Sequence, residues 1–446
     1  MSSEPRTYRV EELIRAGLLE IGDGYRAKNS ELAETGIPFA RAGNINDGFK
    51  FDGADFFPVS ELSRVGSKVS RPGDVVFTSK GTVGRFAFVE QHSQRFVYSP
   101  QLCFWRSLDS ESILPEYLYY WMSSQEFLHQ VSYLKGQTDM ADYVSLRDQR
   151  RMAVTIPSMQ QQRHVVDCLK PIDERIALLR ETNATLEAIA QALFKSWFVD
   201  FDPVHSKDEG VKPEGMDAAT AALFPDSFEE SELGLVPRGW QICSILDIAN
   251  LLSGGTPKTD LAEYWGGDIP WASAKDVSQA ANSILTDTDR TITALGLQKS
   301  ATRMIPAFST VVVARGATTG RMVMFGMTMA MNQTCYALES KAGTPVALYL
   351  VLKNEIDALT QKAHGSVFDT ITTSTFSASK TLQIPDALLA CFESVAGPLF
   401  HRILAGTQQA KTLMQLRDTL LPRLISGQLR LAEAEAYVEN ALSEAI

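Results

Sequence analysis

Residues 165–197 read VVDCLKPIDERIALLRETNATLEAIAQALFKSW, and this stretch decides the fold. Its mainly apolar positions recur at alternating steps of four and three, which is the pattern of a helix that packs along a second helix. The seam consists of Val165, Leu169, Ile172, Ile176, Leu179, Asn183, Leu186, Ala190, Leu193 and Trp197. The spacing predicts one helix over residues 159–199, roughly 60 Å long at 1.5 Å per residue. Asn183 either fixes the register of the pairing or is a tolerated polar residue.

A second seam of the same kind lies near the end of the chain. It consists of Leu389, Phe392, Ala396, Leu399, Ile403, Gly406, Ala410, Leu413, Arg417, Leu420 and Leu424. Gly406 and Arg417 interrupt its apolar pattern. Two seams in one chain favour an antiparallel helical pair, because each then covers the other's apolar face. The alternative is that each seam packs against another protein.

The remainder of the chain repeats itself at an offset of about 230 residues. Residues 37–42 (IPFARA) match residues 269–274 (IPWASA), and Gln101 matches Gln333, both at a shift of 232. The pair Ile156-Pro157 matches Ile384-Pro385 at a shift of 228. A colinear series at an almost constant offset indicates two divergent copies of one unit.

These patterns predict an α+β fold with two similar mixed α/β domains. Two long antiparallel coiled-coil helices join the domains, and the whole has an internal two-fold repeat. Short β-rich runs such as 75–77 and 310–314 alternate with helical stretches such as 115–130 and 345–361. The predicted parts are a first domain (1–157), a central helix (158–201), an acidic linker (202–235), a second domain (236–386), a C-terminal helix (387–428) and an acidic tail (429–446).

Charge is distributed unevenly along the 446 residues. The formal net charge is −11, and residues 200–235 alone carry 10 acidic and 2 basic side chains. Because three prolines lie among those acids, this segment is predicted to be a solvated linker. The two globular parts are almost neutral, so each can present a basic face to nucleic acid.

Targeting, metal and redox signals are weak. We find no apolar run close to the ~18 residues of a membrane helix and no signal peptide, so a cytoplasmic protein is expected. The five cysteines are scattered without a Cys-x-x-Cys pair, and the six histidines are scattered as well. Buried reduced cysteines, no metal site and no catalytic residue are therefore expected.

Two glycine-containing loops are the leading candidates for DNA contact. Residues 75–85 (VVFTSKGTVGR) and 311–321 (VVVARGATTGR) each place a loop with two glycines and flanking basic residues after a strand. Arginine and lysine bind phosphate or guanine, and threonine can bind either bases or phosphate. The candidates are Lys80, Thr82, Arg85, Arg315, Thr318, Thr319 and Arg321. The alternative is an ordinary hairpin turn with flanking charges.

Further candidates come from three matched segments. The first is the matched pair of segments that contains Lys135, Gln137 and Thr138 in one copy and His364 and Ser366 in the other. The second contains Thr256 and Lys258, which follow Gly254-Gly255. The third and weakest contains Lys275, whose counterparts in the first copy lie near Asn44 and Asn46. A tight turn at the domain entrance is the alternative for residues 254–258. Gln101 and Gln333 are expected to stabilise the fold by hydrogen bonds rather than to read bases.

Three motifs resemble type I restriction-modification specificity subunits. Residues 254–257 (GGTP) and 263–271 (EYWGGDIPW) resemble the opening of a target recognition domain. Residues 190–204 (AQALFKSWFVDFDPV) resemble the central conserved region of the family, and residues 420–427 (LLPRLISG) resemble the end of its C-terminal conserved region. The first domain lacks the GGTP opening, so its correspondences are looser. The resemblance implies a non-catalytic reader of an asymmetric, two-part DNA target. It also implies assembly with two adenine methyltransferase subunits and with endonuclease/translocase subunits, which would use S-adenosylmethionine, ATP and Mg²⁺; no cofactor is expected in this chain.

Trp197, Phe198 and Phe201 crowd the end of the central helix. They either form a docking patch for the methyltransferase subunit or belong to a core.

Two rival functions remain open. A self-contained adenine methyltransferase would need an Asn/Asp-Pro-Pro-Tyr/Phe motif, and the chain has only Asp202-Pro203-Val204. A coiled-coil scaffold linking two proteins would suit the repeat and the rod equally well, and sequence-selective DNA binding separates it from a reader.

Overall fold

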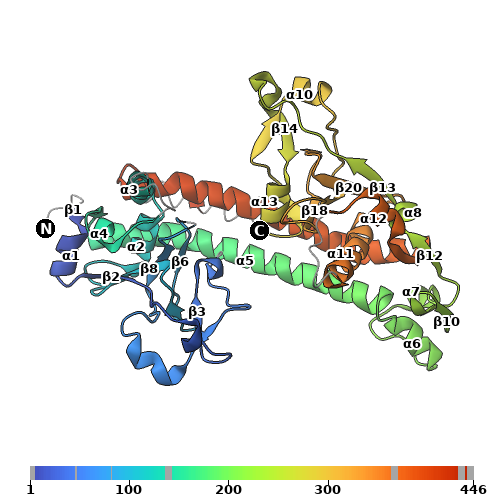
Figure 1. Ribbon diagram of the computed structural model, residues 1–446, viewed down its shortest axis with the longest axis horizontal. Helices are drawn as coiled ribbons and strands as arrows, with labels where there is room; N and C mark the ends of the chain where they lie inside the picture. Colours follow the sequence, from blue (N-terminus) through green and yellow to red (C-terminus); the bar gives the residue numbers. More distant parts are fainter. Residues whose placement is uncertain are drawn as a thin grey trace. The chain divides into compact units, whose positions relative to one another are not determined.

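The computed structural model describes residues 6–45, 48–81, 83–135, 143–362, 370–429 and 437–438 (Figure 1). It consists of two compact units. Unit 1 comprises Met1–Arg175 with Leu413–Ile446, and unit 2 comprises Ile176–Thr412.

Unit 1 contains the first globular domain. Its four-stranded antiparallel sheet has the order β2-β8-β5-β6, formed by Leu19–Asp23, Leu102–Ser107, Val75–Thr78 and Phe86–Phe88. A second sheet has the order β4-β3-β7, formed by Phe56–Phe57, Ile37–Ala40 and Val97–Tyr98. The first strand, β1 (Arg6–Arg9), pairs antiparallel with the last, β9 (Ala153–Ile156). The helices are α1 (Val10–Arg15), α2 (Pro115–Met122), α3 (Gln125–Lys135) and α4 (Leu146–Gln149).

Unit 2 repeats this arrangement strand by strand. Its main sheet has the order β13-β20-β17-β18-β15, formed by Ala249–Ser253, Cys335–Ser340, Thr310–Val313, Met322–Phe325 and Ile284–Leu285. The smaller sheet is β16-β14-β19, formed by Arg290–Ile292, Trp265–Ala272 and Ala330–Met331. Strands β12 (Gln241–Ser244) and β21 (Lys380–Gln383) pair as β1 and β9 do. The helices are α8 (Ile245–Ile248), α9 (Ala274–Gln279), α10 (Ala294–Gln298), α11 (Pro345–Lys362) and α12 (Thr373–Ala378). The predicted internal repeat is thus confirmed, with β15 as an addition.

The two long helices are α5 (Met159–Phe198) and α13 (Asp386–Ile425), each of 40 residues. Within unit 2 they run antiparallel, since Phe194 packs on Phe392 and Asn183 Nδ2 donates to Thr407 Oγ1 at 3.2 Å. Within unit 1 the salt bridge between Asp173 and Arg417 continues the same pairing at 2.9 Å. The prediction that the two seams bury each other is confirmed.

Both interruptions of the second seam have a polar partner. Gly406 leaves room for Asn183, because a Cβ there would lie 2.5 Å from Asn183 Oδ1. Arg417 binds Asp173, whose other oxygen accepts from Tyr120 OH at 2.9 Å. Asn183 is 3% exposed and bonded across the seam. A buried polar group with a single matching partner disfavours other registers, which favours the register function for Asn183.

Helix α13 is also long and apolar enough to cross a membrane, judged by length and composition alone. The sequence predicted no apolar run long enough for a membrane helix. Its seam residues, such as Phe392, Ile403 and Leu413, are buried within the packed protein. A helix that packs in the interior of a domain passes the same test, so this signal is weak evidence for a membrane span.

The acidic segment is folded rather than a solvated linker. It contains α6 (Asp202–Asp208), α7 (Ala218–Ala222) and the hairpin β10–β11 (Phe228–Ser231 and Gly234–Pro237). Val204, Phe224 and Val236 are almost fully buried. The expectation of a linker was wrong because apolar residues spaced among the acids bury themselves while the charges stay at the surface.

The aromatic residues at the end of α5 belong to this core. Trp197 and Phe198 are 9% and 6% exposed, and both pack on Phe392, with ring centroids 5.7 and 5.3 Å apart. Phe201 is partly buried and contacts Trp240. They therefore do not form an exposed docking patch, which was one of the two hypotheses from the sequence. Their packing supports the other hypothesis, that they belong to a core.

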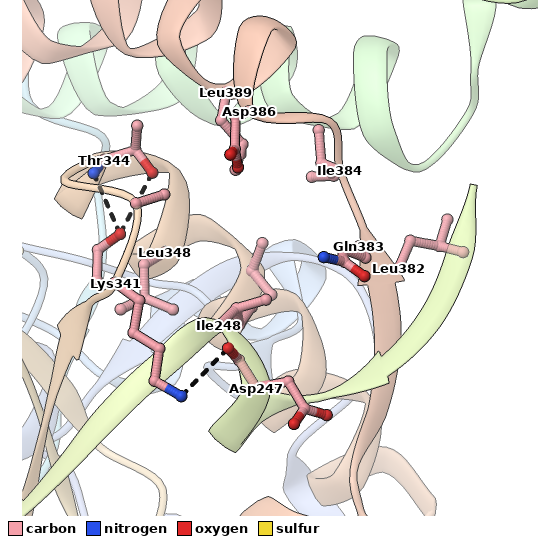
Figure 2. A pocket seen from close by; sticks show the side chains of 13 residues that line it. Asp247, Ile248, Lys341, Thr344, Leu348, Leu382, Gln383, Ile384, Asp386 and Leu389 are labelled. Carbon is pink, nitrogen blue, oxygen red and sulfur yellow. Dashed lines mark hydrogen bonds between the residues drawn. The ribbon is translucent and has the colours of Figure 1, made fainter. Parts of the chain in front are cut away.

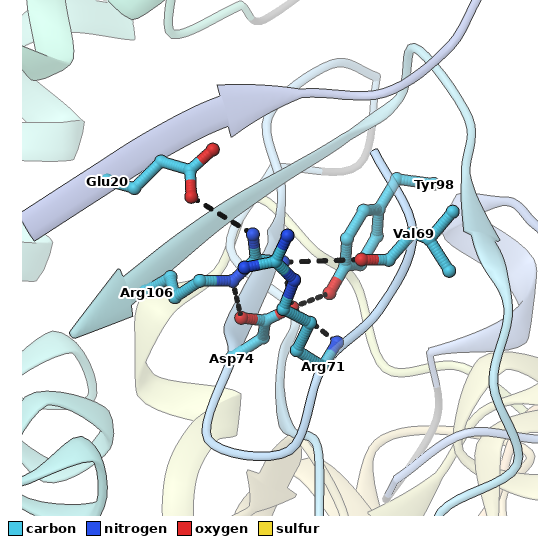
Figure 3. A network of polar contacts seen from close by, with 6 residues as sticks. All are labelled: Glu20, Val69, Arg71, Asp74, Tyr98 and Arg106. Carbon is cyan, nitrogen blue, oxygen red and sulfur yellow. Dashed lines mark hydrogen bonds and ion pairs between the residues drawn. The ribbon is translucent and has the colours of Figure 1, made fainter. Parts of the chain in front are cut away.

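A buried ionic network holds the first domain together (Figure 3). The carboxylate of Asp74 is fully buried and accepts from Arg106 Nε at 2.6 Å and Nη2 at 2.8 Å. It also accepts from Tyr98 OH at 2.6 Å and from the backbone N–H of Arg71 at 2.8 Å. Arg106 reaches Glu20 at 3.0 Å with its remaining edge. Burial together with the Asp74 charge raises the pKa of Tyr98, so its hydroxyl stays a donor.

Candidate nucleic-acid interface

Each domain has a hairpin loop at the end of its central strand. In unit 1 the loop between β5 and β6 closes with a hydrogen bond from Thr78 N–H to Arg85 O at 3.0 Å. In unit 2 the loop between β17 and β18 closes in the same way, from Val313 N–H to Arg321 O at 2.8 Å. The two glycines of each loop have φ between 82° and 106°, a conformation that residues with a Cβ rarely adopt.

The basic residues of both loops are available for contact. Lys80, Arg85, Arg315 and Arg321 are all exposed. Among the described residues, no acidic side chain forms an ion pair with any of the four. Exposed cations at matching places in two domains suit binding of a polyanion. The loops are also hairpin turns with flanking charges, so the two hypotheses from the sequence, a DNA contact and an ordinary turn, predict the same local structure.

The threonines of the second loop are less available. Thr319 Oγ1 donates to Gly316 O at 2.7 Å, and Thr318 O accepts from Arg321 N–H at 3.1 Å. Both side chains are half-buried. These bonds fix the shape of the loop and leave its arginines at the two ends.

A second chain segment joins each loop at its base. Lys80 forms an isolated β-bridge with Tyr143, and Arg315 forms one with Thr370. The segments that end at Tyr143 and Thr370 include the candidates around residues 136–138 and 364–366. Lys135 is the last residue of α3, but Gln137, Thr138, His364 and Ser366, like Thr82, lie outside the described residues.

One glutamine in each domain hydrogen-bonds to a neighbouring turn, although the two turns are not equivalent. Gln101 Oε1 accepts from the backbone N–H of Ala42 at 3.1 Å, and Gln333 Oε1 accepts from Thr256 Oγ1. Arg85 then reaches the same turn in unit 1, donating to the carbonyls of Ala42 and Ile45 at 3.4 Å. Both glutamines thus hydrogen-bond within the fold, as the sequence indicated.

The loop over residues 254–258 is held tightly. A Cβ on Gly254 would lie 2.1 Å from Asn332 O, and Trp271 Nε1 donates to Gly255 O at 3.0 Å. Trp265 Nε1 donates to Lys258 O at 3.1 Å. The reading of these residues as a tight turn therefore has direct support, and the loop still exposes the Lys258 side chain.

The first domain has the same turn without the Gly-Gly-Thr-Pro motif. A Cβ on Gly24 would lie 1.9 Å from Ser99 O, and Tyr25 N–H donates to Tyr98 O at 2.7 Å. In unit 2 the equivalent bond runs from Gly255 N–H to Met331 O at 2.9 Å. Sequence comparison missed this correspondence because only the glycine at the close approach is shared.

Lys275 is exposed but already paired. It forms a salt bridge with Asp289, and this bond holds the pKa of Lys275 above its usual range. Ser273 caps α9, receiving a hydrogen bond from Asp276 N–H at 3.3 Å. Arg41 and Asn44 form the equivalent turn in the first domain, where Arg41 N–H donates to Asn44 Oδ1 at 2.8 Å. Asn46, by contrast, lies outside the described residues.

The matching cysteines do not supply a nucleophile. Cys103 and Cys335 stand two residues after the anchoring glutamines and are buried. Burial raises the pKa of the Cys335 thiol to about 12, and it raises that of Cys103 as well. A protonated, buried thiol is a weak nucleophile.

A hollow of about 210 Å³ in unit 2 lies apart from these loops (Figure 2). It is bordered by α8, the end of β20 and the start of α13, with Asp247, Asp386 and Lys341 on its wall. Lys341 Nζ donates to the carbonyls of Leu246 and Asp247, so its charge stabilises the end of α8. None of the DNA candidates lines it. Among the described residues, no group of three or more histidine, cysteine, aspartate or glutamate side chains could hold a metal ion.

A family model described as the type I restriction modification DNA specificity domain matches residues 12–188 and 237–387. These two matches cover the two domains and more than half of the chain. The chain belongs to the type I restriction-modification specificity subunit family. It is the DNA target recognition component of such a system and not a catalytic one.

Individual members of the specificity subunit family are similar over nearly the full length. The HindI specificity subunit of Haemophilus influenzae is 26% identical, with 88% of this chain and 94% of that protein covered. The MjaIX specificity subunit of Methanocaldococcus jannaschii is 22% identical, with 81% and 78% covered. A crystal structure of the S subunit from M. genitalium has a TM-score of 0.52 at 14% identity, covering 95% of this chain and 96% of that one. This last likeness concerns the fold alone.

Proposed function

We propose that this specificity subunit binds an asymmetric DNA target in two parts, with one domain for each half. The observation that carries the proposal is the hairpin loop that follows the central strand in both units, with the same closing hydrogen bond, a second segment bridged to its base and exposed basic residues at matching places. The scaffold is shared, whereas the exposed residues differ: Lys80 in one loop corresponds to Arg315 in the other. Different side chains on one scaffold would read different sequences.

The proposed contacts are the exposed residues of these loops. Lys80, Arg315 and Arg321 are free to bind phosphate or guanine, and Lys258 extends the surface of the second domain. Arg85 would bind DNA with the N–H groups that do not donate to the carbonyls of Ala42 and Ile45. Thr256 and Thr319 would act mainly by shaping the loops through their hydroxyl groups, whereas Thr318 holds the loop through its backbone carbonyl. Lys275 would have to exchange Asp289 for a DNA phosphate. Thr82, Lys135, Gln137, Thr138, His364 and Ser366 stay predictions from the sequence.

The partners follow from family membership. We propose assembly with two adenine methyltransferase subunits, matching the two-fold repeat, and with endonuclease/translocase subunits for cleavage. Binding of S-adenosylmethionine, ATP and Mg²⁺ would fall to those partners, in the cytoplasm. Since Trp197 and Phe198 are buried, partner docking would use other surfaces of the helices or domains.

The test is to co-express the chain with its methyltransferase subunit and to map methylated adenines by single-molecule sequencing. A single split motif with a modified adenine in each half is expected. Exchange of residues 1–155 for the corresponding domain of another family member should change one half of the motif only. A stable complex without any motif would refute DNA reading by this chain and would favour the scaffold function.

A further inference from the structure

The aromatic residue of the repeated Ile-Pro-aromatic motif lies under a guanidinium in both domains. In the first domain Arg41 Cζ is 5.9 Å from the ring centroid of Phe39. In the second domain Arg290 Cζ is 5.9 Å from Trp271 and 3.4 Å from Trp265. Phe39 and Trp271 are equivalent residues, but the two arginines are not: Arg41 directly follows β3, whereas Arg290 is the first residue of β16.

The charge balance at this place differs between the domains. Asp55 is opposite Phe39, in the position that Arg290 takes opposite Trp271. Arg41 forms an ion pair with Asp55 at 2.5 Å, so the first domain neutralises its guanidinium. In the second domain Ser273 stands where Arg41 would be. The second domain therefore has a cation, Arg290, where the first domain has Asp55. It also has the neutral Ser273 where the first domain has Arg41, so the ion pair of the first domain is not formed at these positions.

Neighbouring acids do not compensate for this charge. Asp289 is paired with Lys275, and Asp276 is bonded to Ser273 and to the backbone N–H of Asp289. Arg290 is exposed, and the structure shows no ion pair to it within the described ranges. A guanidinium stacked on an aromatic ring keeps its N–H edge free and loses little rotamer entropy when that edge binds.

The position of the stack connects it to the proposed interface. Trp265 and Trp271, on which Arg290 lies, donate their indole N–H groups to the carbonyls of the 254–258 loop. Thr256 of this loop bonds to Gln333, and Thr334 O accepts from Ala314 N–H at 2.8 Å, directly before the 315–321 loop. Arg290 is thus linked within unit 2 to both candidate loops.

We propose that Arg290 is a DNA-contacting residue of the second domain. Stacked on Trp265 and beside Trp271, it presents two parallel N–H groups to a pair of acceptors on DNA, either phosphate oxygens or guanine O6 and N7. The inference deepens the proposed function and rests on it. In the first domain the guanidinium over the equivalent aromatic ring, that of Arg41, is paired with Asp55 instead.

The test uses the complex of the full chain with its methyltransferase subunit. Binding to two duplexes of equal length, one with the motif mapped for the unaltered complex and one of random sequence, is measured from 50 to 300 mM salt for Arg290→Ala, Arg290→Lys and Arg402→Ala. Arg402 is an exposed arginine of α13 in the same unit and serves as the matched control. Arg290→Ala is expected to bind roughly tenfold more weakly at low salt and to lower the slope of log K against log salt by about 0.9.

The two sources of the acceptor pair give different patterns. If Arg290 binds a phosphate, Arg290→Lys restores most of the affinity and the methylation motif stays unchanged. If it binds guanine, Arg290→Lys does not restore binding, and one base of the second half-site becomes degenerate. Either pattern supports the inference.

If Arg290→Ala has the same slope, affinity and motif as Arg402→Ala, then Arg290 is a surface residue that only stabilises the tryptophans, and the inference is overturned. This outcome is separate from failure of the proposed function. That failure would appear in the unaltered complex as the absence of any motif, and the random duplex would still report the salt slope for Arg290.

Discussion

Asp74→Ala in the first domain tests how much the buried ionic network contributes to stability. The substitution removes the acceptor of four hydrogen bonds, two from Arg106 and one each from Tyr98 and the Arg71 backbone. Arg106 has a side chain only 5% exposed, so water cannot replace the lost carboxylate. Glu20 remains, at the far edge of the guanidinium. Removal of one partner of a buried ion pair costs about 3–5 kcal/mol, because the other charge stays buried.

The exposed pair of the same domain provides the matched control. Arg41 and Asp55 are each about half exposed, and a salt bridge of this kind contributes about 0–1 kcal/mol. Asp55→Ala should therefore change the free energy of unfolding little. In a unit of about 200 residues, 3–5 kcal/mol corresponds to a fall in Tm of roughly 6–20 °C for Asp74→Ala.

The assay is hydrogen exchange followed by mass spectrometry, together with thermal unfolding. Backbone amides of β5 and β8 should lose protection in Asp74→Ala, and those of β17 and β20 should lose less, because the network lies in the first domain. If Asp74→Ala and Asp55→Ala both cost less than about 1 kcal/mol, the network adds no net stability and the reasoning from burial is refuted.

Three further substitutions test close approaches in the fold. Gly24→Ala and Gly254→Ala place a Cβ 1.9 and 2.1 Å from a backbone carbonyl oxygen, so each should lose about 1–3 kcal/mol in chemical denaturation; Gly43→Ala, with open space around it, should change little, and equal effects at all three would contradict the argument. Gly406→Ala should destabilise by a similar amount because its Cβ meets the amide of Asn183, and adding Asn183→Ala should recover part of the loss. Additive costs in that double mutant would show that the two residues do not interact.

The sequence predicted the helices and the repeat because both rest on periodic patterns. The seam of α5 depends on residues three and four apart, and such local spacing survives divergence between the two copies. The hairpin loops were found for the same reason, since each follows a buried strand and contains two glycines.

Features that depend on distant packing were not predictable. The acidic segment was predicted to be solvated because charged residues dominate its composition. Its few apolar residues, Val204 and Phe224 among them, are buried in the same core as the end of α5. The ambiguity of Trp197 was resolved only by Phe392, almost 200 residues away. Gly24 shares no motif with Gly254, and only the close approach of another strand reveals their equivalence.

The pairing of β1 with β9, and of β12 with β21, brings the two ends of each domain together. A domain of this kind behaves as a cassette: two genetic crossovers, one at each end, would replace it without altering the residues of α5 and α13 that pair with each other. If each domain reads one half of the target, as proposed, new specificity would arise in one recombination event, with the old half-site retained by the other domain. A gene organised in this way would change its target faster than point mutation allows, and the proposed partner subunits would not need to evolve with it.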